Sequence, residues 1–276
     1  MFPCQARHSH NLPEFLPDIS PLGSGAPANS MSMFDWNYWL SEFESRAPRL
    51  VVARVARGSV LTAEERTRIA DSIGTFQLGE QSEGRTLLRF AREFGAQRGC
   101  QELGRVTELF IREEQHHAAQ LREFMLAHGI ALKQRNWTDS IFRHIRRLAG
   151  FETAVTILVT AEMVGFVYYR ALGRATQNAC LRTICRQMCT DEAVHLRYEA
   201  QLLRTLRGTR PRWLGAVVGL AHRSLLVVAA HVVYREHRAV LDFAGHDART
   251  FVRDCRSLYR TVLATPRASA SDFSRS

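Results

Sequence analysis

Two short stretches of this chain repeat a pattern of acidic and histidine residues that is suited to metal binding. In "REEQHHAAQL", Glu114 and His117 are three positions apart, and in "CTDEAVHLRYE", Glu192 and His195 have the same spacing. Residues three apart on a helix lie next to each other on one face. Carboxylate suits iron and manganese, and imidazole tolerates both. One Glu-x-x-His pair is a weak signal, but its repetition predicts two ligand pairs that belong to one site.

One further acidic residue lies upstream of each pair at nearly the same distance. Glu83 is 31 residues before Glu114, and Glu162 is 30 residues before Glu192. Glu162 lies in the apolar stretch "TILVTAEMVGFVYY", where an unpaired buried carboxylate is costly. A metal ion removes that cost. Four Glu and two His that converge in a helical bundle match the ligand set of dinuclear carboxylate proteins.

The elements that must position these residues are helical. Strand-like alternation is nearly absent from about residue 36 onward, so we expect an all-α fold. The periodicity predicts helices over about 62–95, from 106 to at least 124, 149–173, 178–207, 213–234 and 246–263, with the start at Thr62 marked by Glu64 and Glu65. Glycine-containing stretches at 95–100 and 173–179 lie near the midpoint between each upstream acid and its partner. Two helical hairpins would therefore bring the acids face to face.

Two alternatives in the ligand set remain open at this point. Glu80 shares a helix face with Glu83 and is the alternative ligand, although Glu83 keeps the two hairpin spacings more nearly equal. Glu113 and His116 also have the Glu-x-x-His spacing. The register that starts at Glu114 is preferred because it repeats "DEAVH", with an acid in front of the ligand. Tyr169, two turns after Glu162, is a candidate redox-active or hydrogen-bonding phenol, although such a tyrosine is more often part of a core.

The composition is that of a globular protein, and it does not identify a binding partner. The 276 residues are 46% hydrophobic, which is ample for a buried core. The formal net charge is +10, but the arginines are dispersed through every predicted helix, so there is no strong nucleic-acid signal. The six cysteines form no CxxC pair, which favours reduced thiols and a cytoplasmic location. The first thirty residues lack the apolar segment of a secretory signal.

The chain divides by composition into four parts. Residues 1–35 are expected to be a disordered leader, and residues 36–210 contain the predicted metal-binding bundle. Residues 211–264 form a helical extension, and 265–276 form a polar tail. Within the extension, 213–234 is apolar but is interrupted by His222, Arg223 and His231. A buried or subunit-contacting helix, as in a homodimer, is preferred there over association with a membrane surface.

Over about residues 65–207 the sequence resembles the ferritin-like di-iron superfamily, which contains rubrerythrins, bacterioferritins, ribonucleotide reductase small subunits and di-iron oxygenases. The resemblance implies a four-helix bundle with a long crossover between its second and third helices, here at 129–149. It also implies two iron ions, with Mn/Fe and Mn/Mn as alternatives. In this family an acid before the ligand Glu often hydrogen-bonds a ligand histidine, which assigns that role to Glu113 and Asp191. The implied ligands are Glu83, Glu114, His117, Glu162, Glu192 and His195.

The implied activity is oxidation or oxygenation of an unknown substrate with O2. Because CxxC pairs of the rubredoxin type are lacking, the electrons are expected to come from a separate donor or from the substrate. One alternative is ferritin-like iron oxidation and storage, or protection against oxidative stress. Two further alternatives are a tRNA-modifying hydroxylase and a hydroxylase at a membrane surface that attaches through 213–234.

Overall fold

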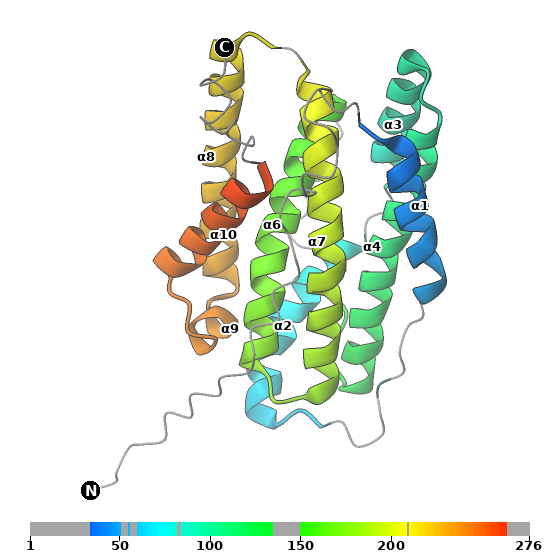
Figure 1. Cartoon of the computed structure of the whole chain (residues 1–276). Helices are drawn as coiled ribbons and strands as arrows, with labels where there is room; N and C mark the ends of the chain where they lie inside the picture. The colour runs from blue at the N-terminus through cyan, green and yellow to red at the C-terminus, as the bar shows by residue number, and fades with distance from the viewer. Residues whose placement is uncertain are drawn as a thin grey trace, which may run out of the picture.

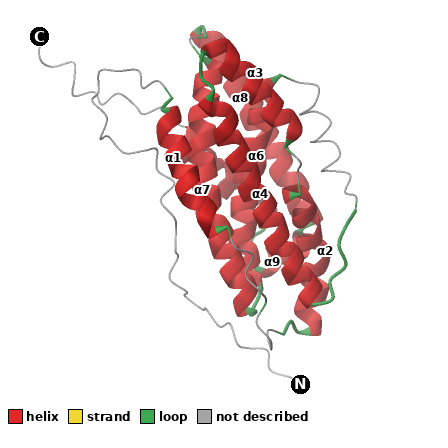
Figure 2. Ribbon diagram, turned by 90° about the vertical axis from the view of Figure 1, so that its right-hand side faces the viewer, coloured by secondary structure: helices red, strands yellow, loops and turns green. Residues whose placement is uncertain are grey.

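The computed structural model describes residues 34–50, 55, 60–81, 84–134, 150–208 and 210–263, and within these ranges the architecture is all-α, without a strand. The long helices run roughly alongside one another (Figures 1 and 2). In chain order, the elements are α1 (Trp36–Arg46), the 3-10 helix η1 (Ala47–Arg49), α2 (Ala63–Glu80), α3 (Arg85–Arg98), α4 (Glu102–Ala127), α6 (Phe151–Ala175), α7 (Ala179–Arg207), α8 (Arg212–Glu236), α9 (Arg238–Phe243) and α10 (Ala248–Leu263).

Local capping signals set the helix ends that fix the register of the site. Thr62 caps α2 in a capping box, since its hydroxyl accepts from the Glu65 amide while the Glu65 carboxylate accepts from the Thr62 amide. Asn178 caps α7 by accepting from the Leu181 amide. Gly99 ends α3 with a left-handed φ of 67°. The predicted turns at 95–100 and 173–179 are therefore confirmed.

The predicted single helix over 62–95 is wrong, because the chain breaks after Glu80 and α3 starts only at Arg85. Gly84 adopts a left-handed φ of 62° immediately before α3. A Cβ at this glycine would lie 2.5 Å from the Ile111 side chain, so the close approach to α4 also requires glycine. The periodic apolar pattern continued across this break, and this made two helices look like one.

Helix α1 covers the side of the structure on which the histidines lie. It packs against α4 and buries Trp39 and Phe43 completely. The Trp39 indole donates a hydrogen bond to Gln201 Oε1 at 2.8 Å. The Phe43 ring is stacked against the imidazole of His195, with 6.1 Å between ring centroids. This contact ties α1 to α7 close to the predicted ligands.

The C-terminal helices pack directly onto the helices that carry the predicted site. Helix α8 contacts α6 and α10, and α10 also contacts α7. Among the described helices, Phe151–Ala175 and Trp213–Glu236 are long and apolar enough to cross a membrane by length and composition. In the most apolar part of the first helix 67% of the residues are buried, as expected of a core helix, whereas in that of the second helix only 22% are buried. Within one chain the 213–234 segment is exposed at Trp213, Leu220 and Val228 among others, so contact with a second subunit and association with a membrane surface both stay predictions.

Several sequence predictions fall on residues outside the described ranges. These are residues 1–33 of the predicted leader at 1–35, residues 135–149 of the predicted crossover at 129–149, and the predicted tail at 265–276. Glu83 also lies outside the described residues.

Candidate metal centre

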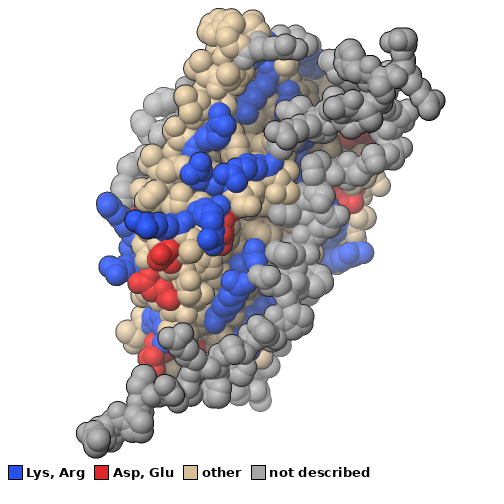
Figure 3. Space-filling model, turned by 60° about the vertical axis from the view of Figure 1, so that its left-hand side comes forward, with Lys and Arg blue, Asp and Glu red and all other residues tan. Residues whose placement is uncertain are grey.

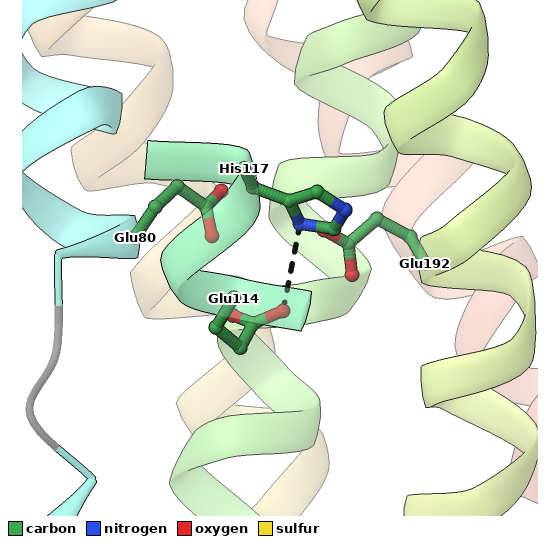
Figure 4. A group of neighbouring side chains, drawn as sticks. All are labelled: Glu80, Glu114, His117 and Glu192. Atoms are coloured by element: carbon green, nitrogen blue, oxygen red, sulfur yellow. Dashed lines mark ion pairs between the residues drawn. The ribbon is translucent and has the colours of Figure 1, made fainter. Parts of the chain in front are cut away.

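Six acidic and histidine side chains from four helices meet in the interior as two overlapping groups. One group consists of Glu80, Glu114, His117 and Glu192, and the other of Glu114, Glu162, Glu192 and His195. Within each group, one potential ligand atom per residue lies within 4.8 Å of all the others. Figure 4 shows the first group, with Glu80 from α2, Glu114 and His117 from α4, and Glu192 from α7. Glu114 and Glu192 belong to both groups, so they lie between the two sets of partners.

The atoms that point into this cluster lack hydrogen bonds. Glu114 Oε1, His117 Nδ1, Glu192 Oε2 and His195 Nδ1 are buried and have no hydrogen-bond partner. Buried polar atoms are nearly always hydrogen-bonded, so four such atoms in one place need an explanation. All four are of the types that bind metal ions, and two of them, His195 Nδ1 and Glu114 Oε1, are 3.1 Å apart. The cluster could therefore hold a metal ion, which would satisfy these atoms.

The outward nitrogen of each histidine is held by a carboxylate from the opposite helix. His117 of α4 pairs through Nε2 with Asp191 Oδ2 of α7 at 3.2 Å. His195 of α7 pairs through Nε2 with Glu113 Oε2 of α4 at 2.9 Å. Hydrogen bonds of this kind fix the ring orientation and leave the other ring nitrogen available to a metal. The structure thus places Glu113 and Asp191 in the positions that the resemblance implied.

Arg46 at the end of α1 joins these two carboxylates. Its guanidinium donates to Glu113 Oε1 at 2.9 Å and to Asp191 Oδ1 at 2.5 Å. Gln187 also donates to Asp191 at 2.9 Å. Although burial opposes it, the ion pairs with His117 and Arg46 lower the pKa of Asp191 to about 2. Both carboxylates are therefore ionised at neutral pH and can polarise the histidines.

The electrostatics of the cluster without a metal are those of crowded, buried charges. Burial, together with the nearby charges of Glu114 and Glu192, raises the pKa of both Glu80 and Glu162 well above the usual value. Burial lowers the pKa of His117, but the carboxylates of Asp191 and Glu114 outweigh it and raise the pKa well above normal. The metal-free cluster therefore holds protons that an incoming metal ion must displace.

The predicted phenol lies beside the cluster. Tyr169 is fully buried on α6, and its hydroxyl donates to Glu80 Oε1 at 2.5 Å. Burial and the neighbouring Glu80 carboxylate raise the Tyr169 pKa well above 10.0, so the phenol keeps its proton. Its position therefore suits a hydrogen-bond donor that orients Glu80.

The two sequence alternatives are placed differently by the structure. Glu80 belongs to the first ligand group, whereas the preferred Glu83 lies outside the described residues. His116 belongs to neither group, and it is only partly buried. The structure brings Glu114 and His117 into the cluster instead.

Sequence reasoning missed three residues near the centre. Arg46 gave no local signal, because it is one of many arginines and lies 67 residues before Glu113. Gln187 lies one turn before Asp191 on α7, a spacing that helical geometry could have indicated. Glu199 is a buried acid one turn after His195, and its charge contributes to the raised pKa of Glu162.

The fold and the cluster define an all-α protein with a buried carboxylate and histidine group that could hold a metal ion. Comparison of the chain with protein-family models, with curated proteins and with solved structures finds no significant match.

Proposed function

We propose that this chain is a ferritin-like oxidoreductase that holds two metal ions, preferentially iron, and uses O2 to oxidise or oxygenate a substrate. The observation that supports the proposal best is the overlap of two ligand groups at Glu114 and Glu192. Two carboxylates shared between two sets of terminal ligands are the arrangement of a carboxylate-bridged metal pair. Alternatives to two irons are Mn/Fe and Mn/Mn centres, since the same donor set suits both elements.

In this proposal each metal has its own terminal carboxylate and imidazole. Glu80 and His117 would hold one ion, Glu162 and His195 would hold the other, and Glu114 and Glu192 would bridge them. The four helices that carry these ligands, α2, α4, α6 and α7, would be the four-helix bundle implied by the resemblance. Glu80 then takes the position that the sequence interpretation gave to Glu83.

The bound metal pair would supply the electrons that reduce O2. Hydroxylation of a C–H bond consumes one O2, two electrons and two protons, and it yields one hydroxyl group on the substrate and one water. A separate reductase would supply the two electrons. The chain's own contribution would be to hold the ligands and to orient Glu80 through Tyr169. Glu113 and Asp191 would keep the Nδ1 atoms of the two histidines available to the metals.

Metal analysis after anaerobic reconstitution with Fe(II) tests this proposal. We expect about two metal ions per chain in the wild type and a sharp loss in Glu162→Ala and His195→Ala. His231→Ala is the matched control, because His231 is exposed on α8 and its Nδ1 contacts only the local Val227 carbonyl. Optical spectra recorded on addition of oxygen would then show whether the loaded protein activates O2. A wild-type chain that takes up no metal would refute the proposal, and a 24-subunit shell by light scattering would favour iron storage.

A further inference from the structure

A cavity of about 200 Å³ lies against the carboxylate side of the cluster. Glu80, Glu114, Glu162 and Glu192 all line it, whereas His117 and His195 do not. The histidines lie on the side that α1, Arg46 and the outer carboxylates cover. The cluster is therefore closed on its histidine side and faces an open space on its carboxylate side.

The cavity wall away from the cluster is mainly apolar. Besides Thr75, Thr160 and Glu236, the lining outside the four cluster glutamates is formed by apolar residues and glycines, including Phe76, Leu87, Phe110, Ile157, Val164 and Val233. The chain has 37 Lys and Arg residues, and Figure 3 shows several of them on one face, yet none of the described residues that line the cavity is Lys or Arg. An anionic group held away from the proposed metal ions would be surrounded by apolar side chains and would meet no Lys or Arg among these lining residues, at a high cost in free energy. The lining therefore selects against anions and favours neutral, apolar molecules.

The C-terminal extension completes this cavity. Ala229, Val233 and Glu236 of α8 line it together with residues of α2, α3, α4, α6 and α7. Ala161 of α6 also lines it and is exposed, so the cavity opens to the surface beside this residue. The packing of α8 on α6 thus gives the extension a specific role, because it forms one wall of a space next to the cluster.

Small residues on α6 leave the space open close to the cluster. Gly165 is one helical turn after Glu162, and it lines the cavity. A Cβ at Gly165 would meet only Tyr169 Cε2, at an ordinary contact distance of 3.8 Å. A Cβ therefore fits at this position, and because Gly165 lines the cavity we expect a longer side chain to take its volume from the cavity.

We propose that this cavity binds the substrate, and that the substrate is a neutral, apolar molecule about the size of a substituted benzene ring. The substrate role rests on the function proposed above. The size follows from volume, since a dry apolar cavity of about 150 Å³ accommodates benzene. The apolar wall holds the molecule, and the carboxylate side of the cluster is where its reactive bond would lie.

Binding of toluene and of benzoate, measured by titration calorimetry at pH 7, tests the inference on both metal-free and metal-loaded full-length protein. The two probes share a ring and differ in charge. In the metal-free protein we expect toluene to bind and benzoate not to bind at the same concentration, and in the metal-loaded protein we expect toluene still to bind. Gly165→Leu should weaken toluene binding by at least about tenfold, because the leucine side chain fills the space.

Gly215→Leu is the matched control. Gly215 is also a helical glycine, it is exposed on α8, and a Cβ there would meet nothing within 4 Å. Both substitutions replace a helical glycine by leucine, so the comparison corrects for the change in helix propensity. Ala161→Phe is a second variant that narrows the opening without filling the core, and it should slow or weaken toluene binding.

The outcomes separate this inference from the proposed function. Equal binding of benzoate and toluene to the metal-free protein, or unchanged toluene binding in both Gly165→Leu and Ala161→Phe, would overturn the substrate class even if two metals bind. A chain that binds no metal would overturn the substrate role together with the proposed function, whatever the toluene result. Selective toluene binding to the metal-free protein that is lost in Gly165→Leu and kept in Gly215→Leu, in a chain that also takes up metal, would support both.

Discussion

Replacement of Glu113 by glutamine should weaken metal binding without touching a metal ligand. The Glu113 carboxylate accepts hydrogen bonds from two donor groups, the imidazole of His195 (Nε2 to Oε2 at 2.9 Å) and the guanidinium of Arg46 (Nε to Oε1 at 2.9 Å and Nη2 to Oε2 at 3.1 Å). Glutamine has nearly the same shape but only one acceptor oxygen. In either orientation of the amide, its NH2 group would face one of these two donors. The variant therefore loses a negative charge beside His195 and leaves a buried donor without an acceptor.

The loss of the charge and the loss of the hydrogen bond both lower the affinity for the metal ion. Removal of the charge makes the His195 imidazole a weaker ligand, and loss of the hydrogen bond frees its orientation. Changes in groups that orient a metal-bound histidine typically cost 10–100-fold in affinity, which is about 1.4–2.7 kcal/mol. The buried unsatisfied donor should also lower the stability of the metal-free protein by about 1–3 kcal/mol.

Anaerobic titration of Fe(II) against a competing chelator would measure the affinity, and urea unfolding of the metal-free protein would measure the stability separately. Glu123→Gln is the matched control, because Glu123 is on the same helix and half its side chain is exposed. Equal Fe(II) affinity in folded Glu113→Gln and Glu123→Gln would refute the role assigned to Glu113.

Two further predictions concern the identity of the α2 ligand and the response of the fold to acid. Glu80→Gln should reduce the metal content found by elemental analysis, whereas Glu83→Gln should retain it; the opposite pattern would return Glu83 to the ligand set. His222 is buried, its Nδ1 accepts from Arg207 at 3.1 Å, and burial lowers its pKa to about 3. Below pH 6.5 the unfolded chain binds a proton at His222 that the folded chain does not bind, so stability falls with decreasing pH. Between pH 7 and pH 5 the wild type should lose about 2 kcal/mol more than His222→Gln in urea unfolding, and parallel losses would contradict this explanation.

The ligand pairs were accessible to sequence reasoning because they depend on local geometry. Glu114 and His117 face the same way on any α-helix, and so do Glu192 and His195. The turns at 95–100 and 173–179 were also local, since glycine and the Asn178 cap define them. Local spacing and turn signals were therefore sufficient to predict that the two Glu-x-x-His pairs face each other. Their ability to bind iron stays a prediction.

Tertiary contacts were not accessible in this way. Arg46 reaches Glu113 and Asp191 across 67 and 145 residues of sequence, and no spacing rule connects them. The break between α2 and α3 was missed for a similar reason. The apolar pattern continues through it, whereas the close approach of Gly84 to Ile111 that requires the break is a contact between different helices. The preference for Glu83 rested on equal spacing in the two hairpins. That argument assumed one continuous helix over 62–95, whereas α2 ends at Glu80 and α3 starts at Arg85.

The position of this break has an electrostatic consequence for the cluster. Glu80 is the last residue of α2, so its carboxylate lies at the end of the helix where the macrodipole is negative. A carboxylate at this end is destabilised when ionised, in the same direction as the rise in its pKa caused by burial and by Glu114. A divalent cation reverses both effects, because it is attracted by the carboxylate and by the helix end together. A helix that continued past residue 80 would lose the second contribution, so a break at this point stabilises positive charge beside Glu80, either a proton on the carboxylate or the metal ion proposed above.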